Sequence, residues 1–422
     1  MTQDAALGID IGTSGVRIAA RGRDGALLAM SQAAMAAPLV DFGRALQDSA
    51  IWWEALVAAF AGLKLDGLRV LSLAIDGTSG TILPCDVDGA PLGLASMYND
   101  VAEAAAVKAI QQVAPAETAA LGSTSPLARA LMMEAKAPRI LHQADWLVGK
   151  LCGRFDVSDE NNALKSGYDP VQRTWPAWIA GTGFDVSRFP KVVPAGAHVG
   201  AILPAMAKQF GLPADVAVVA GTTDGCAAFL ASGARDAGDG VSSLGTTLTI
   251  KVLSATPVFA PQFGIYSHRI GDQWLAGGAS NTGGGVLASF FNREEIARLT
   301  ALMDPAVPTG LDYYPLSRPG ERFPINDPAF APRLTPRPPQ DHLFLQGLLE
   351  GIAAVEALAY RKLAELGASP LASIRSVGGG AANEKWTMMR LRALGVPAKE
   401  PESEHAAMGT ARLAWRGIGH DA

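Results

Sequence analysis

The sequence predicts an α/β protein built from two similar halves. Two glycine turns lie roughly 230 residues apart, Asp10–Gly15 and Ser242–Thr247, and they share one local pattern. Apolar β-forming residues flank each turn, so each is predicted as strand, tight turn, strand. Helical and strand patterns alternate along the rest of the chain, which is typical of α/β proteins.

The strand that follows the first turn distinguishes between the known kinds of phosphate-binding fold. Dinucleotide-binding folds and P-loops continue from the glycine turn into a helix. Here residues 16–20 continue as a strand, and residues 22–25 reverse the chain into residues 26–30, a predicted hairpin. We therefore predict two ribonuclease H-like (actin-like ATPase) domains flanking a central cleft, whose two turns bind a polyphosphate from opposite sides. The alternative is two unrelated β-turns in a chain with 46 glycines.

Composition favours a cytoplasmic enzyme. The chain has 422 residues, 49% of them hydrophobic, which is enough for two buried cores. The net charge of −5 predicts no nucleic-acid partner. Three separated cysteines suggest reduced thiols, and the absence of a signal-like N-terminus or an 18-residue apolar run predicts no membrane partner.

Periodicity predicts the main elements in chain order. An apolar stripe predicts a helix over residues 50–63 after a polar cap at Asp48-Ser49, followed by a buried strand over 70–75. Eight prolines exclude a regular helix from residues 314–340. A 3.6-residue period then predicts a long helix over 343–366.

Two aspartates are candidate reactive groups. Asp10 ends a strand beside a glycine turn, where a carboxylate can hold a hydrated divalent cation against phosphates. The structural alternative is an aspartate that forms the turn. Asp224 lies in the run Val218–Gly225, just past an apolar strand and before the predicted small-residue helix Cys226–Ala231. It is either a helix N-cap or a base for an attacking hydroxyl.

Two further turns are candidate ligand sites. Gly378–Asn383 lies between a predicted strand over 374–377 and a predicted helix over 385–394. Its glycines let a flat ring approach the backbone, although a helix-entry loop is the simpler alternative. Asn99-Asp100 offers polar groups suited to a polyhydroxy ligand.

These segments together resemble the FGGY carbohydrate kinases of the sugar kinase/Hsp70/actin superfamily, over essentially the whole chain. The segments that carry the resemblance are Asp10–Gly15, Asp76–Gly80, His142–Cys152, Ser158–Ala163, Gly221–Gly225, Ser243–Thr247, Gly320–Pro324 and Gly378–Asn383. Shorter runs resemble the short cyanobacterial and plant branch associated with D-ribulose phosphorylation, whose members were often named xylulose kinases. These runs are His142–Trp146, Asn161–Lys165, Tyr266–Arg269 and Gly278–Gly284.

The resemblance implies a role for each matching residue. Asp10 would organise Mg²⁺ through water, and Asp224 would accept the proton of the sugar hydroxyl. The remaining contacts would be Gly12, Thr13, Ser14, Gly245, Thr246 and Thr247 to the phosphates of ATP; Gly379, Gly380 and Asn383 to adenine; and Asp10, Ser79, Asp100 and Asp224 to the sugar. It also implies a sugar-binding domain over residues 1–228, with a helix at about 405–422 packing back on it. A nucleotide-binding domain would cover residues 229–404.

One departure limits the choice of sugar. Many family members carry Trp-x-Asp-x-Arg near the sugar, whereas this chain has Tyr98-Asn99-Asp100-Val101-Ala102 and lacks the arginine. The expected reaction is phosphorylation of a ketopentose, D-ribulose before D-xylulose, with another sugar or polyol as an alternative. Two other classes stay open: a sugar-independent actin- or Hsp70-like ATPase, and a sugar sensor without catalysis. The sequence carries no signal for or against an oligomer.

Overall fold

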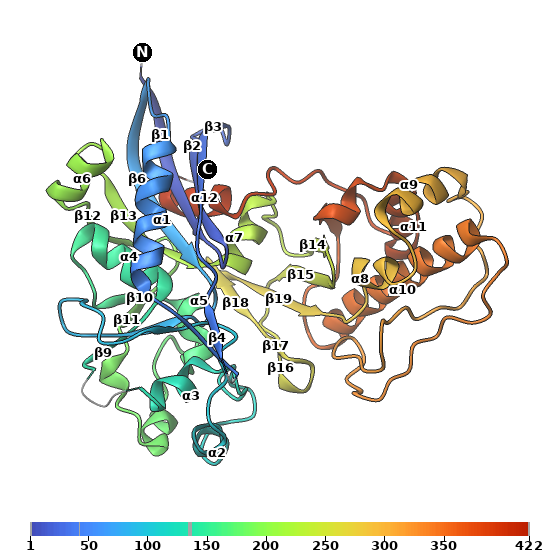
Figure 1. Ribbon diagram of the computed structural model, residues 1–422, viewed down its shortest axis with the longest axis horizontal. Coiled ribbons are helices and arrows are strands. Elements are labelled where there is room, and N and C mark those ends of the chain that lie inside the picture. The colour runs from blue at the N-terminus through green and yellow to red at the C-terminus, as the bar shows by residue number, and fades with distance from the viewer. Residues whose placement is uncertain (1, 42, 134–136, 421–422) are drawn as a thin grey trace. The chain divides into compact units, whose positions relative to one another are not determined.

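The chain folds into two compact units in the computed structural model, which describes residues 2–41, 43–133 and 137–420. Unit 1 comprises Met1–Ala231, His268–Gly271 and His405–Ala422, and unit 2 comprises Ser232–Ser267 and Asp272–Glu404. The red C-terminal helix α12 (Ala406–Arg416) therefore belongs with the blue N-terminal strands (Figure 1).

Unit 1 is built on a six-stranded sheet with the order β12-β13-β6-β1-β2-β3. Its strands are β1 (Gln3–Ile11), β2 (Gly15–Gly22), β3 (Leu27–Ala34), β6 (Leu68–Gly77), β12 (His198–Ala201) and β13 (Ala217–Thr223). β2 and β3 form the predicted hairpin, while β6 runs parallel to both β1 and β13. The carboxyl ends of β1, β6 and β13 therefore meet at one edge of the sheet, where parallel α/β sheets commonly bind ligands.

Alternating residues of β1 face two different helical layers. Leu7, Ile9 and Ile11 join the large core cluster that includes residues of α1 (Ser49–Gly62) and α4 (Gln143–Cys152). Ala6, which directly precedes Leu7, packs with Ala414 and Trp415 of α12. Because strand side chains alternate between faces, small residues on the second face let α12 lie close to the sheet.

A second sheet in unit 1 has the order β4-β5-β8-β7-β9. Its strands are β4 (Leu39–Asp41), β5 (Arg44–Gln47), β7 (Ile82–Cys85), β8 (Ala95–Ser96) and β9 (Arg139–His142). The remaining elements are α2 (Ala104–Gln111), α3 (Pro126–Leu131), β10 (Val157–Asp159), α5 (Glu160–Ala163), β11 (Lys191–Val193), α6 (Pro204–Phe210), α7 (Asp224–Ala231) and β18 (His268–Ile270). This region carries the turn at residues 77–81.

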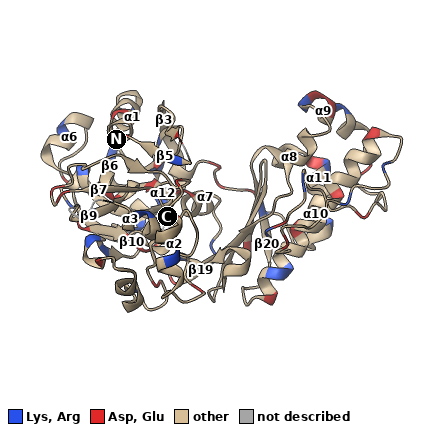
Figure 2. Ribbon diagram, turned by 60° about the horizontal axis from the view of Figure 1, so that its bottom comes forward, with Lys and Arg blue, Asp and Glu red and all other residues tan. Residues whose placement is uncertain are grey.

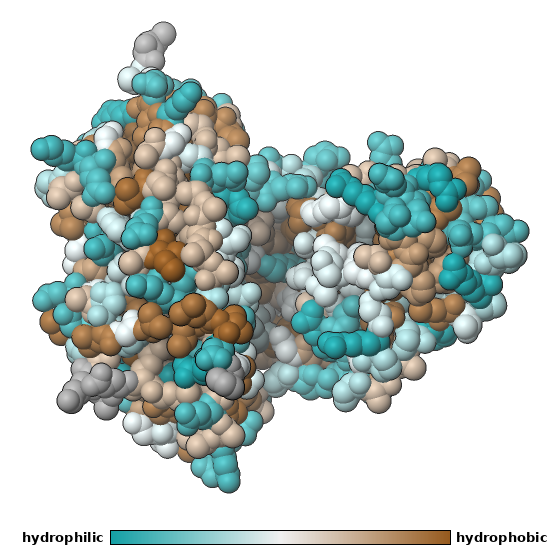
Figure 3. Space-filling view, viewed as in Figure 1, coloured by the Kyte–Doolittle hydropathy of each residue, from teal (hydrophilic) through white to brown (hydrophobic). Residues whose placement is uncertain are grey.

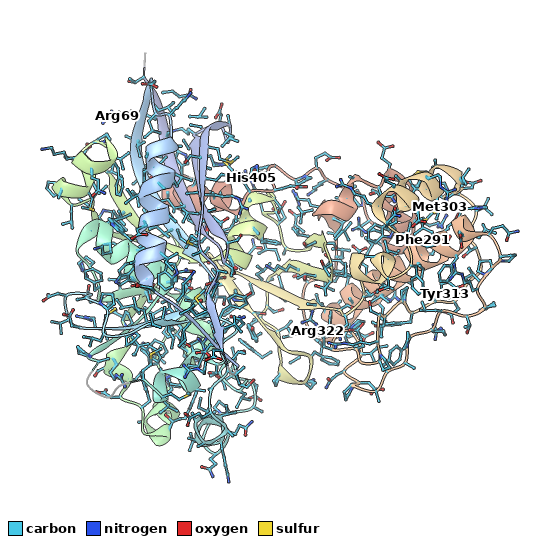
Figure 4. The ribbon with its side chains drawn as sticks, in the orientation of Figure 1. Arg69, Phe291, Met303, Tyr313, Arg322 and His405 are labelled. Carbon is cyan, nitrogen blue, oxygen red and sulfur yellow. The ribbon has the colours of Figure 1, made fainter. Side chains whose placement is uncertain are left out.

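In unit 2, strands β19, β15, β14 and β20 lie side by side in one sheet, in that order. The strands are β14 (Asp239–Leu244), β15 (Leu248–Ser254), β16 (Phe259–Ala260), β17 (Ile265–Tyr266), β19 (Gln273–Ala279) and β20 (Ser373–Val377). The helices are α8 (Gly284–Ala288), α9 (Arg293–Leu302), α10 (Asp341–Glu365) and α11 (Glu384–Leu394). Phe291, Met303 and Tyr313, labelled in Figure 4, belong to the core of this unit.

The predicted elements and the irregular segment are confirmed. α1, β6, α10, β20 and α11 lie where periodicity placed them, and residues 303–340 contain no helix or regular strand. Phe323 and Tyr314 of this irregular segment are buried in the core. α10 is long and apolar enough to cross a membrane, but 78% of its most apolar window is buried inside the protein, as in the core helix of a soluble protein.

The surface mixes residue types on both units. Basic and acidic residues are interspersed, and α9 carries both signs (Figure 2). Hydrophobic and hydrophilic residues are likewise interspersed on the visible face of each unit (Figure 3). Exposed hydrophobic residues include Leu39 and Val40 of β4.

Candidate active site

Three carboxylates gather at the carboxyl edge of the unit 1 sheet. Asp10 near the end of β1 is the direct register partner of Asp76 on β6. Asp224 is the first residue of α7 and follows β13 immediately. Asp10 and Asp76 are buried, whereas Asp224 is partly exposed. Asp224 is therefore the most accessible of the three side chains.

Burial controls the ionisation of the two inner carboxyl groups. Burial raises the pKa of Asp10, with the charge of Asp224 acting in the same direction, while Asp76 and Arg17 lower it. Burial and the charge of Asp10 raise the pKa of Asp76 well above its usual range. Like charges in one low-dielectric site favour a shared proton. The pKa of each inner carboxyl group is therefore raised, and that of Asp76 is raised more strongly.

Two side chains fix the carboxyl groups in place. Thr410 of α12 donates a hydrogen bond to Asp76 Oδ2. The Arg17 Nη1 atom lies 3.3 Å from Asp10 Oδ2 and supplies a compensating positive charge. The sequence analysis missed Asp76 as a member of this cluster, and it missed both supporting residues.

The first glycine turn joins β1 to β2 through residues 12–14. The Gly12 N–H donates to the Gly15 carbonyl oxygen at 3.0 Å, which closes the turn. Ser14 is exposed, and Thr13 is partly exposed. Backbone and hydroxyl groups in such a turn can bind an anion, so the geometry is compatible with phosphate binding.

Ser79 lies in a turn that Gln143 holds from the start of α4. Gln143 Oε1 accepts hydrogen bonds from the N–H and hydroxyl groups of Thr78 at 3.0 and 2.9 Å. The Gln143 N–H donates to the Thr81 carbonyl oxygen at 3.1 Å. The Ser79 hydroxyl is buried without a protein hydrogen-bond partner, as is Gln143 Nε2. Buried polar atoms of this kind normally have a partner, and a bound polyhydroxy ligand would supply one.

Asp100 is fully buried and already satisfied by protein groups. Arg44 donates two hydrogen bonds to its carboxylate at 2.9 and 3.1 Å. Ala45 N–H and the Ser96 hydroxyl donate the others, at 3.0 and 2.5 Å. Burial raises the pKa of Asp100, but the bonds from Arg44 and Ser96 outweigh burial and lower it overall. These contacts favour a supporting role over direct contact with sugar.

Two arginines from other parts of the chain, Arg44 and Arg129, lie in the region of Asp100. Arg44 pairs with Asp100 from a strand far away in sequence. Arg129 is buried and donates to Ser96, to Met97 and to the Gly80 carbonyl oxygen. Arg129 thereby connects the Ser79 turn to the Asp100 segment, and burial lowers its pKa to about 10. No local sequence pattern identifies either arginine.

The second glycine turn joins β14 to β15 through residues 245–247, matching the three-residue turn of unit 1. Thr246 and Thr247 are exposed. The carbonyl oxygens of Gly245 and Thr246 accept hydrogen bonds from Gly284 and Gly285 at 2.8 and 2.9 Å. The backbone of residues 284 and 285 thus holds the turn, while Thr246 and Thr247 stay exposed.

Gly379 and Gly380, the two central glycines of the Gly378–Asn383 turn, have different surroundings. A Cβ atom on Gly380 would lie 2.5 Å from the Trp386 ring, whereas a Cβ on Gly379 would meet nothing within 4 Å. Asn383 caps α11 by accepting from Trp386 N–H at 3.0 Å, and it donates to Thr300 at 3.3 Å. Gly379 therefore offers open backbone, while Gly380 and Asn383 shape the turn.

The carboxyl edge of the unit 1 sheet suits a cation that takes most of its ligands from water and phosphate. Among the described residues, no group of three His, Cys, Asp or Glu side chains is arranged to hold a metal ion. Mg²⁺ commonly takes one or two carboxylates and completes its shell with water and phosphate oxygens. Asp10 fits that limited role because it is ionisable and adjoins the first glycine turn.

Family models match both parts of the chain. The N-terminal domain model of the FGGY family of carbohydrate kinases matches residues 130–231, and the C-terminal domain model matches residues 240–418. Together they cover most of the sequence, including Asp224 and the second glycine turn.

Curated relatives and solved structures agree with these matches. An L-fuculokinase of Salmonella typhi is 26% identical over 99% of this chain and 93% of its own length. A xylulose kinase of Escherichia coli is 25% identical over 91% of this chain and 83% of its own. The fold resembles the xylulose kinase structure from Rhodospirillum rubrum with a TM-score of 0.84, at 22% identity and coverage of 99% and 91%.

Proposed function

Because the chain belongs to the FGGY family of carbohydrate kinases, we propose that it transfers the γ-phosphate of ATP to a terminal hydroxyl group of a ketopentose, with D-ribulose preferred. The enzyme class, a sugar kinase, follows from the family. The observation that carries the catalytic assignment is the position of Asp224, partly exposed beside the buried Asp10 and Asp76.

The proposed reaction uses Asp224 as the general base. Asp224 accepts the proton as the sugar oxygen forms its bond to the γ-phosphorus, and the bond from that phosphorus to the oxygen of the leaving ADP breaks. Ser79 holds the sugar through its otherwise unpartnered hydroxyl group. A general base contributes about 10²- to 10⁴-fold in rate.

The phosphate groups are assigned to the two glycine turns. Residues 12–14 and 245–247 offer backbone and hydroxyl groups, and phosphoryl transfer depends mainly on alignment and charge stabilisation. Bound Mg²⁺ would neutralise phosphate charge. Asp10 would hold its water ligands, and Gly379, Gly380 and Asn383 would border the adenine.

The preference for D-ribulose rests on sequence resemblance. The short branch described above is associated with that sugar. A relative from Halalkalibacterium halodurans, 25% identical over 44% of this chain, is named a ribulokinase without a stated stereoisomer. D-Xylulose is the second candidate, because relatives matching nearly the whole chain are named xylulose kinases. We further propose a cytoplasmic enzyme acting on small molecules, without nucleic-acid or membrane partners.

ADP release with and without a panel of ketoses tests this proposal. We expect release that depends on sugar and is highest with D-ribulose. Equal ATP hydrolysis without sugar would favour an actin- or Hsp70-like ATPase. Ketose binding without turnover would favour a sensor, and either outcome would reject the proposed function.

A further inference from the structure

Glu321 is a buried carboxylate in the Gly320–Pro324 segment, to which the proposed function assigns no role. We propose that Glu321 is a positioning residue that fixes the 280–285 segment against the second glycine turn, and so sets the geometry in which that turn receives the phosphates of ATP. This inference rests on the proposed function for its ligand. The contacts that carry it lie entirely within unit 2.

Glu321 collects hydrogen bonds on both carboxylate oxygens while only 3% exposed. Oε2 accepts from the hydroxyl groups of Ser280 and Tyr314 at 2.6 and 2.9 Å. Oε1 accepts from the N–H groups of Asn281 and Arg322 at 2.8 and 2.9 Å. A buried carboxylate is costly unless it is bonded in this way, so its presence implies a specific use of these bonds.

Ser280 and Asn281 carry the effect of Glu321 toward the glycine turn. Ser280 and Asn281 follow β19 directly. Arg322, the neighbour of Glu321, is labelled near the end of that strand in Figure 4. The Ser280 hydroxyl also accepts from Thr282 N–H at 3.1 Å. The Ser280 hydroxyl group therefore connects the carboxylate to Thr282, two residues further along the segment.

The 280–285 segment is in turn bonded to residues 245 and 246 of the glycine turn and to Leu248, which follows the turn. Leu248 N–H donates to the Thr282 carbonyl oxygen at 2.8 Å, and Ser280 N–H donates to that of Leu248 at 2.9 Å. Gly284 and Gly285 bond the carbonyl oxygens of residues 245 and 246, as described above. These four bonds leave the turn little freedom to move independently of the segment.

Close packing adds to the hydrogen bonds. Gly283 has a φ of +138°, a conformation that favours glycine. A Cβ atom there would lie 2.8 Å from both Leu248 N and the Thr246 carbonyl oxygen. Since the two backbones touch, a shift of the segment displaces the turn that presents Thr246 and Thr247.

Tyr314 provides a matched control. It donates to the same carboxylate as Ser280, but its backbone pairs with Arg333 instead of the 280–285 segment. Tyr314→Phe therefore removes one bond from Glu321 without removing any bond to the segment. A general loss of stability would appear in both variants, whereas a loss of positioning would appear in Glu321→Gln alone.

Glu321→Gln and Glu321→Ala test the inference in the full chain. The amide cannot accept from both backbone N–H groups and also accept from both hydroxyl groups, so Gln weakens the network and Ala removes it. We expect Glu321→Gln to raise the KM for ATP about tenfold, with the KM for ketose changed less than twofold, since small misplacements in a phosphoryl-transfer site are costly. Glu321→Ala should have the larger effect, and Tyr314→Phe should leave both constants near the wild-type values.

Hydrogen exchange supplies a readout that needs no substrate. The amides of residues 248, 282, 284 and 285 should exchange faster in Glu321→Gln than in wild type or Tyr314→Phe. Unchanged exchange at these amides, or equal changes in both KM values, would overturn the inference. If wild type phosphorylates no sugar, the proposed function fails, and the exchange result still decides whether Glu321 positions the turn.

Discussion

Gly8 of β1 lies so close to Ala407 of α12 that no side chain fits between them. A Cβ atom built on Gly8 would lie 1.8 Å from the Ala407 carbonyl oxygen and 2.3 Å from Ala411 N. The same helix approaches α7, where a Cβ on Gly409 would lie 2.0 Å from the Ala227 carbonyl oxygen. Two glycines thus bring α12 close to both the strand that carries Asp10 and the helix that begins at Asp224.

Gly8→Ala is expected to destabilise unit 1. The obstructing atoms are backbone, so β1 or α12 must shift, and overpacking of this kind costs about 1–3 kcal/mol in the free energy of unfolding. Thermal and denaturant unfolding measure the effect. Gly93→Ala is the control, because its nearest neighbour would be a Pro84 side-chain atom at 3.7 Å. Equal midpoints for the two variants would contradict the close approach.

Gly379→Ala and Gly380→Ala should separate nucleotide binding from folding. Gly380→Ala is expected to lower the unfolding temperature, because its Cβ would meet Trp386 at 2.5 Å and Leu244 at 2.8 Å. Gly379→Ala should fold normally and raise the KM for ATP, because its methyl group would occupy the open space assigned to adenine. Normal ATP affinity in Gly379→Ala would remove that residue from the proposed pocket.

Asp224→Asn should abolish sugar phosphorylation while nucleotide binding stays near wild type. The base acts on the sugar hydroxyl and has no assigned contact with adenine, so turnover should fall by about 10²-fold or more. Asp10→Asn should instead change turnover and the dependence on Mg²⁺ together. Calorimetric ADP binding combined with steady-state rates separates the two variants. Near-normal turnover in Asp224→Asn would leave Asp224 with a structural role at the start of α7.

We predict that the Asp239 carboxylate stabilises unit 2 and that this stabilisation depends on pH. Burial raises its pKa, but bonds from Ser373, the Arg235 backbone and Lys399 outweigh burial and lower it overall. A depressed carboxyl pKa stabilises the fold above the unfolded value of about 3.9, and this stability is lost as the pH falls through the folded pKa. The gap in unfolding midpoint between wild type and Asp239→Asn should therefore narrow on going from about pH 6 to about pH 3. A gap independent of pH would contradict this account.

Local patterns predicted much of the fold because their causes are local. Glycine turns between apolar runs placed residues 12–14 and 245–247 correctly between strands. The 3.6-residue period identified α10 because one side of a core helix must be apolar along its length. Helix ends were also close to those observed, since residues such as Asp48 and Asn383 cap them.

The contacts that complete the candidate site depend on long-range pairing. Asp76 belongs to Asp76–Gly80, one of the segments that carry the family resemblance, but only the strand order sets it beside Asp10. Thr410 lies 334 residues from Asp76, and Arg44 lies 56 residues from Asp100. No periodicity or motif connects residues at such separations. Strand order and packing determine these contacts, so the sequence pattern alone could not predict them.

Product analysis tests the central claim most directly. The chain is incubated with Mg-ATP and either D-ribulose or D-xylulose at millimolar concentration, and phosphorus NMR with mass spectrometry identifies the products. We predict one sugar monophosphate for each ADP formed, with D-ribulose giving the higher kcat/KM. ADP without sugar phosphate, or no phosphorylation of either ketose, would contradict the assignment of this chain as a ketopentose kinase.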